Sequence, residues 1–333
     1  MDPGSEPGMT AVFVHINEKP ATMPQRPFTQ VDVFTDTPYL GNPLAVVLDG
    51  TGLDSDDMQH FARWTNLSET TFVLAPSLQA VERGADYRVR IFTPGGELPF
   101  AGHPTLGTCH AWLQAGGVPQ VPGQVVQECA QGLITIRQSG TRLAFAAPPL
   151  QRHLPDPALV AQVAAALVLD TRHILASQTL DNGPIWLGLL LDSAEVLLAL
   201  QPNHQRLKAL GQKVGLAHMD KGLTATTLVA RSNREARAFG QRAGHLNGTA
   251  DAPALSVRAF AAATGVPEDP VTGSLNASLA QWLIEEGLAP KSYIATQGTC
   301  LGRHGQVLLN QDDSGQVWVG GNSVTCIAGF VTL

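Results

Sequence analysis

Hydrophobic and polar residues alternate along several stretches of the chain, and elsewhere they form short continuous apolar runs. Both patterns are typical of strands. In the first half of the chain they predict strands at residues 28–34, 44–48, 70–74, 87–92, 125–129, 133–137 and 143–146. In the second half they predict strands at 224–230, 255–260, 306–309 and 317–319. The 33 glycines and 23 prolines supply the turns that many short strands need, so the sequence predicts a strand-rich fold.

Apolar residues three or four positions apart predict a smaller number of helices between these strands. Acidic or proline residues, which are favoured in the first turn, mark several of their starts. The expected helices follow Asp54, begin at Pro104 and Pro157, span residues 204–214, and begin at Ser274. The helix at Pro104 carries an apolar stripe and stops at two glycines, and the helix at Ser274 stops at Gly287.

Three compact polar motifs interrupt the pattern where a strand or loop meets a helix. They span residues 66–72, 97–105 and 268–274. The first contains Glu69, the second His103 and the third Asp269. Backbone N–H groups at a helix start are free to hold an anion. A proton-transfer carboxylate, a histidine and an aspartate beside such groups indicate an acid–base enzyme for small molecules.

The second and third motifs begin about half the chain length apart, which indicates two similar halves. Each follows a strand that carries an arginine and a phenylalanine, Arg90 and Phe92 in one case and Arg258 and Phe260 in the other. We therefore expect two structurally similar halves that face each other, with the site in the cleft between them.

Composition shifts set the expected domain boundaries. Residues 1–26 are rich in proline, glycine and polar residues and are expected to form a flexible extension. Residues 27–148 form the predicted N-terminal half, completed by the C-terminal strand at about 322–333. Residues 149–321 form the predicted C-terminal half, since Pro148 and Pro149 punctuate the chain.

Charge and cysteine content narrow the possible partners. A net charge of −7 without a basic run argues against nucleic acid. No apolar run is long enough to span a membrane, and the N-terminus lacks the pattern of a signal peptide, so the expected location is cytoplasmic. The four cysteines form no CxxC pair and no histidine cluster has zinc-ligand spacing, so we expect no metal.

The motifs resemble those of the PhzF family, the phenazine-biosynthesis isomerases related in fold to diaminopimelate epimerase. The resemblance runs from about Phe28 to the C-terminus and rests on several motifs in fixed order. The matching segments are 31–34 with 41–43, 66–69, 90–94, 97–103, 268–274, and 297–298 with 302–303.

The resemblance implies a mixed α/β (α+β) fold of two pseudo-symmetric diaminopimelate-epimerase-like halves, each a curved, mostly antiparallel sheet around a central helix. It also implies a homodimer that needs no cofactor and binds a small carboxylate-bearing substrate. The family reaction is isomerisation of 2,3-dihydro-3-hydroxyanthranilate. By this resemblance Glu69 is the catalytic acid/base. The substrate-binding positions would be His103, Asp269, Gly102, Gly273, Ser274 and Asn42.

Elementary chemistry supports these roles but leaves alternatives open. Burial would raise the pKa of Glu69 towards neutral, and His103 is a residue that titrates near neutral pH. Glu69 and Asp269 are also ordinary capping residues, and Asn42 lies in a Gly-Asn-Pro turn that needs no functional explanation. Glu97 and Glu268 are expected to hold backbone N–H groups.

Three functions remain as alternatives at this point. The first is a cofactor-independent isomerase in which one carboxylate moves a proton. The second is an epimerase or dehydratase for amino or hydroxy acids, although racemisation by two opposed thiols is disfavoured because Cys109 lies within a helix stripe and the third motif has no cysteine. The third is a non-catalytic dimeric protein that binds a small molecule.

Overall fold

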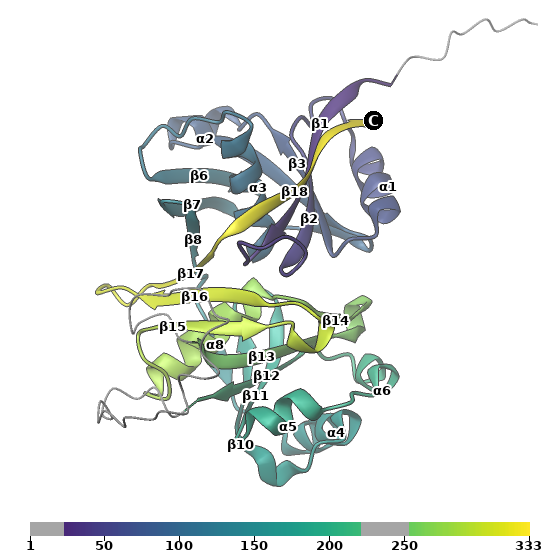
Figure 1. Ribbon diagram of the computed structural model, residues 1–333, viewed down its shortest axis with the longest axis vertical. Helices are drawn as coiled ribbons and strands as arrows, with labels where there is room; N and C mark the ends of the chain where they lie inside the picture. Colours follow the sequence, from purple (N-terminus) through teal and green to yellow (C-terminus); the bar gives the residue numbers. More distant parts are fainter. Residues whose placement is uncertain (1–22, 221–252) are drawn as a thin grey trace, which may run out of the picture.

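The computed structural model describes residues 23–220 and 253–333 of the chain, which form two lobes stacked along the long axis (Figure 1). The predicted strand at 224–230 and residues 1–22 of the predicted extension lie outside the described residues. The prediction that the extension continues to residue 26 is wrong at its end, because the first strand, β1, already begins at Gln25.

The N-terminal lobe is a sheet with one helix inside its curve and two helices outside. Its elements are β1 (Gln25–Val33), β2 (Asn42–Val47), α1 (Ser55–Thr65), β3 (Glu69–Leu74), α2 (Leu78–Glu82), β4 (Tyr87–Thr93), β5 (Gly96–Leu98), α3 (Gly102–Gln114), β6 (Gln124–Cys129), β7 (Gly132–Ser139), β8 (Arg142–Ala146) and β18 (Ser323–Thr332). The strands pair in the order β18-β1-β2-β3-β4-β6-β7-β8, with β5 added to β4.

The C-terminal lobe repeats this plan. Its elements are β9 (Gln151–His153), α4 (Pro157–Leu167), β10 (Ile174–Asp181), β11 (Ile185–Leu191), α5 (Ala194–Ala199), α6 (His204–Ala209), β12 (Val214–Met219), β13 (Pro253–Ala261), β14 (Val266–Asp269), α8 (Gly273–Glu285), β15 (Ser292–Gln297), β16 (Gly305–Gln311) and β17 (Val317–Gly321). The strands pair in the order β9-β10-β11-β12-β13-β15-β16-β17, with β14 added to β13.

The two orders match strand for strand, and so do the directions. In each lobe most pairs are antiparallel, and the parallel pairs are β2–β3 and β4–β6 in one lobe and β11–β12 and β13–β15 in the other. Parallel neighbours need a crossover, and α1, α3, the α5–α6 pair and α8 provide one at each position. The predicted fold of two pseudo-symmetric halves is therefore confirmed.

The chain crosses between the lobes twice, and each time it adds an edge strand to the sheet of the lobe that it enters. After β8 the chain enters the C-terminal lobe, where β9 pairs with β10 at the edge of the sheet. After β17 the chain returns to the N-terminal lobe, where β18 pairs with β1 at the edge of that sheet (Figure 1). β8 and β17 pair with each other and join the two sheets. The sheet curvature and this joint hold the two central helices in a fixed relation.

The central helices α3 and α8 are buried on nearly every side. Nine residues of α3 and nine of α8 are buried, many of them Gly, Ala, Ser or Thr. Small residues are needed because the strands lie close. A side chain on Gly107, for example, would meet Leu44 and Val33 at 2.7 Å. Because the sheet surrounds each central helix, apolar and small residues occur on most of its sides. The contrast between an apolar and a polar face is therefore weak in the sequence.

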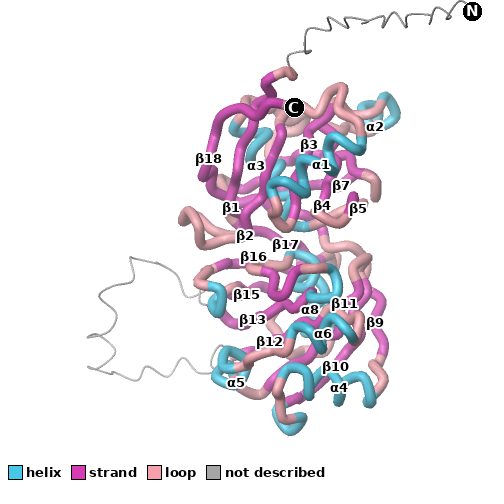
Figure 2. Tube along the Cα trace, turned by 90° about the vertical axis from the view of Figure 1, so that its right-hand side faces the viewer, coloured by secondary structure: helices cyan, strands magenta, loops and turns pink. Residues whose placement is uncertain are grey.

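Separate apolar clusters bind the outer helices to the outer faces of the sheets. Met58 and Phe61 of α1 pack on Phe72 of β3, and α4, α5 and α6 pack on β11 and β12. Figure 2 shows α1 on the outer surface of one lobe and α4, α5 and α6 on that of the other.

An arginine and a glutamate form an ion pair at equivalent positions of the two lobes. The Nε of Arg90 donates to Glu97 at 2.7 Å, and the Nε of Arg258 donates to Glu268 at 2.9 Å. The expectation that Glu97 and Glu268 hold backbone N–H groups is therefore wrong. Each guanidinium also lies 5.0 Å from the ring centroid of the phenylalanine two residues later, which confirms the repeat seen in the sequence.

The helix predicted at 204–214 is too long. The structure ends α6 at Ala209, and the left-handed turn at Gly211 leads directly into β12, which begins at Val214. The strands β5, β9, β10, β11, β12, β14 and β15 were not predicted. The run that forms β11 is almost continuously apolar, and such runs do not distinguish a strand from a buried helix.

Candidate active site

The N-termini of the two central helices meet between the lobes. A Cβ atom added to Gly102 would lie 3.2 Å from the Cα of Gly273, so only glycine allows this approach on both sides. The N-cap side chains of α1, α2, α4, α5 and α6 each accept a hydrogen bond from their helix, whereas Ala101 of α3 and Thr272 of α8 accept none. The two helix starts therefore offer positive dipole ends without a side-chain cap, which favours an anion between them.

Glu69 and His103 lie side by side at the α3 end of this junction. Glu69 is the first residue of β3, where the chain leaves α1 through the left-handed residue Asn66, and His103 is the second residue of α3. The Oε2 of Glu69 lies 3.3 Å from the Nε2 of His103. Both atoms are buried, and neither has a hydrogen-bond partner of good geometry among the described residues. Buried polar atoms without partners are rare, and a ligand would satisfy these two.

Burial controls the protonation of both residues. It raises the pKa of Glu69 to about 8, and the nearby charge of Asp269 adds to this rise while Lys213 opposes it. Burial lowers the pKa of His103 to about 3. The expected rise for Glu69 is confirmed. The expectation that His103 titrates near neutral pH is wrong, because burial keeps its imidazole neutral.

Asp269, from the C-terminal lobe, approaches the same place and is held by Asn42 of the N-terminal lobe. The Nδ2 of Asn42 donates to Asp269 at 2.9 Å and to the carbonyl oxygen of Val271 at 2.8 Å. It also lies 3.5 Å from the Nδ1 of His103, but its two hydrogens are used by the shorter bonds. Asn42 thus links the lobes, and its own Oδ1 is a further buried atom without a partner in the described chain.

Asp269 does not cap the helix that follows it, which was the structural alternative. Thr272 is the N-cap of α8, and its hydroxyl donates to Asp269 at 2.6 Å. Burial raises the pKa of Asp269 to about 6, while the hydrogen bonds from Thr272 and Asn42 and the charge of Lys213 oppose the rise. Asp269 is therefore ionised in most molecules at pH 7 while Glu69 keeps its proton.

Gln297, at the end of β15, supports this arrangement and was not among the predicted site residues. Its Oε1 accepts from the backbone N–H of Thr272 at 3.0 Å and from Asn276 at 2.9 Å. Its Nε2 donates to the hydroxyl of Thr272 and to the carbonyl oxygen of Asp269, both at 2.9 Å. All four hydrogen-bonding positions of the amide are used, so Gln297 fixes the turn before α8. The only sequence signal was its place in a segment that matched the family.

Gly273 and Ser274 complete the C-terminal side of the site. The hydroxyl of Ser274 accepts a hydrogen bond from the indole Nε1 of Trp186 at 3.3 Å, and its carbonyl oxygen accepts from Asn182 at 3.0 Å. By position in the helix, Gly273 and Ser274 are equivalent to Gly102 and His103. The structure thus brings all seven predicted site residues together around the junction of α3 and α8. Their individual roles remain predictions.

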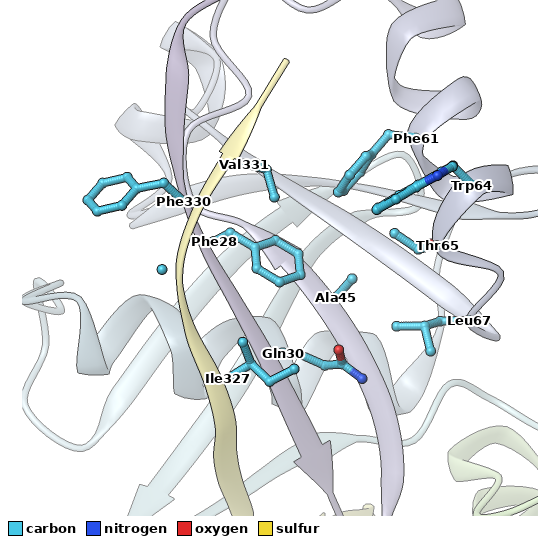
Figure 3. Close-up of a pocket in the computed structure, with 11 residues that line it drawn as sticks. Phe28, Gln30, Ala45, Phe61, Trp64, Thr65, Leu67, Ile327, Phe330 and Val331 are labelled. Carbon is cyan, nitrogen blue, oxygen red and sulfur yellow. The ribbon is translucent and has the colours of Figure 1, made fainter.

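A hollow of about 370 Å³ lies away from the helix junction, between α1 and the outer edge of the N-terminal sheet (Figure 3). It is lined by Phe28, Gln30, Ala45, Phe61, Trp64, Thr65, Leu67, Ile327, Gly329, Phe330 and Val331. None of these side chains is an acid or a base. The hollow therefore offers an apolar surface and no group for proton transfer.

Within residues 23–220 and 253–333, no three His, Cys, Asp or Glu side chains are grouped so that they could hold a metal ion. None of the helices in these ranges combines the length and the hydropathy that a membrane crossing requires.

Comparison with known proteins identifies the family. The model of the PhzC-PhzF family, described as phenazine biosynthesis-like proteins, matches residues 31–329. The chain belongs to the PhzC-PhzF family. The trans-2,3-dihydro-3-hydroxyanthranilate isomerase of Pseudomonas aeruginosa is 31% identical over 314 residues, which cover 91% of this chain and 98% of that protein. The Schizosaccharomyces pombe protein named antisense-enhancing sequence 1 is 32% identical over 321 residues, 92% of this chain and 99% of that protein.

A solved structure of the same family shares the fold. The crystal structure of the phenazine biosynthesis protein of the PhzF family from Bacillus anthracis superimposes with a TM-score of 0.74 at 21% identity, and covers 93% of this chain and 100% of that one. The predicted enzyme class, an isomerase of the PhzF type, is confirmed by these relatives. The homodimer expected of a PhzC-PhzF protein remains a prediction.

Proposed function

We propose that this PhzC-PhzF protein is a cofactor-independent isomerase that moves a proton within a small carboxylate-bearing substrate of the 2,3-dihydro-3-hydroxyanthranilate type. The supporting observation is the buried Glu69 carboxyl, whose pKa is raised to about 8 and whose Oε2 has no partner among the described residues. A relative with a sequence identity of 31% over nearly its whole length is named for this reaction.

Glu69 suits a reaction in which one group donates a proton to one carbon and then accepts a proton from another. At pH 7 its carboxyl is mostly protonated, and losing the proton costs only about 1.4 kcal/mol for a pKa one unit above the pH. One oxygen thus donates a proton to one substrate carbon and removes a proton from another. The substrate is isomerised with no atom gained or lost, and Glu69 regains its starting form.

The surrounding residues would hold the substrate for this transfer. Neutral His103 and the Oδ1 of Asn42 present unpartnered hydrogen-bonding atoms in the described structure, and ionised Asp269 accepts from an amine or hydroxyl group. The helix starts at Gly102 and at Gly273 favour the substrate's anionic group. These contacts distinguish an amino- or hydroxy-substituted carboxylate from a plain hydrocarbon ring.

Racemisation by paired thiols finds no support in the site. Cys109 is buried inside α3, and burial raises its pKa to about 12. The two helix starts carry His103 and Ser274 at the equivalent positions. A single carboxylate on one side of the substrate therefore fits better than two opposed thiol bases.

The test is proton NMR of trans-2,3-dihydro-3-hydroxyanthranilate with the protein in D2O. We expect the wild type to convert the substrate with deuterium at the newly protonated carbon, and Glu69→Gln to remain folded and lose turnover by at least about a hundredfold. Glu82→Gln is the matched control, because it makes the same chemical change at the exposed end of α2. Full turnover by Glu69→Gln, or no conversion by the wild type, would refute the proposal.

A further inference from the structure

Lys213 lies beside the candidate active site and belongs to none of its motifs. It immediately precedes β12, and its carbonyl oxygen accepts a hydrogen bond from the backbone N–H of Leu187 at 2.8 Å. This pairing places it opposite Trp186, and its Nζ lies 5.8 Å from the centroid of the Trp186 ring. Trp186 in turn donates to the hydroxyl of Ser274 at the start of α8. Lys213 is thus connected to the C-terminal side of the site through one aromatic ring.

The internal repeat makes Lys213 the counterpart of Glu69. Thr70 pairs with Phe92 in the N-terminal lobe, and Val214 pairs with Phe260 at the equivalent place in the C-terminal lobe. The residue before Thr70 is Glu69, and the residue before Val214 is Lys213. The fold therefore places an acid on one side of the helix junction and a cation at the matching place on the other.

The ammonium group of Lys213 lacks an ion-pair partner among the residues that the structure describes. No carboxylate of the described residues lies within 4.0 Å of it, although the side chain is half-buried. Burial lowers its pKa, while the charges of Glu69 and Asp269 act in the opposite direction. Among the described residues it is the only cation whose charge acts on both carboxyls. A half-buried cation without a counter-ion is costly unless an anion binds beside it.

We propose that Lys213 binds the carboxylate of the substrate on the α8 side of the site and so turns the reactive carbons towards Glu69. Ionised Asp269 repels a carboxylate and protonated Glu69 does not attract one, whereas Lys213, with the uncapped start of α8 at Ser274, attracts it. This inference rests on the proposed function for the identity of the substrate, and it adds the residue that selects for an anion and sets its orientation.

The experiment measures binding by isothermal titration calorimetry at pH 7.5 with two probes. The first is 3-hydroxyanthranilate, the aromatic analogue of the proposed substrate, and the second is 2-aminophenol, the same ring without the carboxylate. The variants are Lys213→Met, which keeps an unbranched side chain of nearly the same length and removes the charge, and Lys213→Arg, which keeps the charge. Lys208→Met, on the exposed surface of α6, is the control for the same change elsewhere.

We expect Lys213→Met to weaken binding of 3-hydroxyanthranilate about tenfold to a hundredfold, the range for a hydrogen bond to a charged group. The affinity of Lys213→Met for 2-aminophenol should stay within about twofold of the wild-type affinity, because this probe has no carboxylate and the substitution removes only a local charge. Lys213→Arg should recover most of the loss, and Lys208→Met should bind both probes as the wild type does. In the D2O assay, Lys213→Met should raise KM by a similar factor and change kcat much less.

The results separate this inference from the proposed function. Equal affinity of wild type and Lys213→Met for 3-hydroxyanthranilate would overturn the inference, as would equal loss for both probes or no binding of the carboxylate to the wild type. Binding that depends on Lys213, without isomerisation by the wild type, would support the inference and refute the proposed function. Isomerisation by the wild type, together with an unchanged KM in Lys213→Met, would support the proposed function and refute the inference about Lys213.

Discussion

Replacing Glu69 by Gln should change the stability of the protein in a way that depends on pH. The native structure holds this carboxyl with a pKa of about 8, against 4.5 for an unperturbed glutamate, because it is buried and close to Asp269. Between these two values the unfolded chain releases the proton and the folded chain keeps it. The native state therefore binds more protons than the unfolded state, and stability falls as the pH rises through this window.

The size of the effect follows from the two pKa values. The cost of keeping the proton in the folded state is roughly 1 kcal/mol at pH 5 and roughly 3 kcal/mol at pH 7. The glutamine variant has no such cost at any pH. The difference in unfolding free energy between Glu69→Gln and wild type should therefore increase by about 2 kcal/mol from pH 5 to pH 7 in favour of the variant.

Urea unfolding followed by circular dichroism at pH 5, 6 and 7 measures this difference. Asp269 is present in both proteins, so its own titration cancels to first order, and any hydrogen bond that the new amide makes contributes equally at each pH. Glu82→Gln on α2 is the matched control, because it makes the same chemical change at an exposed position. A difference between Glu69→Gln and wild type that does not change with pH would show that the native carboxyl is ionised, and the acid–base role would lose its physical basis.

Three further substitutions follow, two that test the support of the site and one that serves as a control. Gly298→Ala should lower the free energy of unfolding by about 2–4 kcal/mol, because Gly298 has a φ of +95° and a Cβ there would lie 2.7 Å from the carbonyl oxygen of Pro270. Gly315→Ala, with a φ of +87° and open space around it, should cost only about 1 kcal/mol by the same urea measurement, and equal costs would contradict the steric argument. Asn42→Ala should raise the pKa of Asp269 above its value of about 6, because one hydrogen bond to the carboxylate is lost. Carbon-13 NMR titration of the carboxyl group measures this shift, and an unchanged pKa would show that Asn42 does not stabilise the charge.

The sequence predicted the two-lobed plan and the residues at the helix junction because both depend on short local patterns. Gly102 and Gly273 mark places where two helix starts come into contact, and the polar residues beside them stand out against an apolar background. Arg90 and Arg258 appeared in the sequence as part of a repeat, although the ion pairs that they form were not predicted. Local spacing records which residues recur, but not what each one contacts.

The features that were missed depend on strand pairing. Lys213 faces the site only because β12 pairs with β11 in one particular register, and a shift of one residue would turn it to the opposite face. Gln297 reaches Thr272 because β15 ends beside the turn before α8. The lowered pKa of His103 results from burial, which the sequence does not show for a single residue. Each of these is a tertiary property of a fold assembled from distant segments.

The internal repeat explains why the site is asymmetric in chemistry although it is nearly symmetric in backbone. Two equivalent helix starts would bind an anion equally well from either side, and a symmetric site would leave the substrate without a fixed orientation. The chain breaks this equivalence at two pairs of equivalent positions, with His103 in place of Ser274 and Glu69 in place of Lys213. One side of the junction can then exchange a proton and the other can hold a negative charge. A proton delivered from one fixed side reaches one face of the substrate, so the broken symmetry supplies the orientation that isomerisation by a single carboxyl group requires.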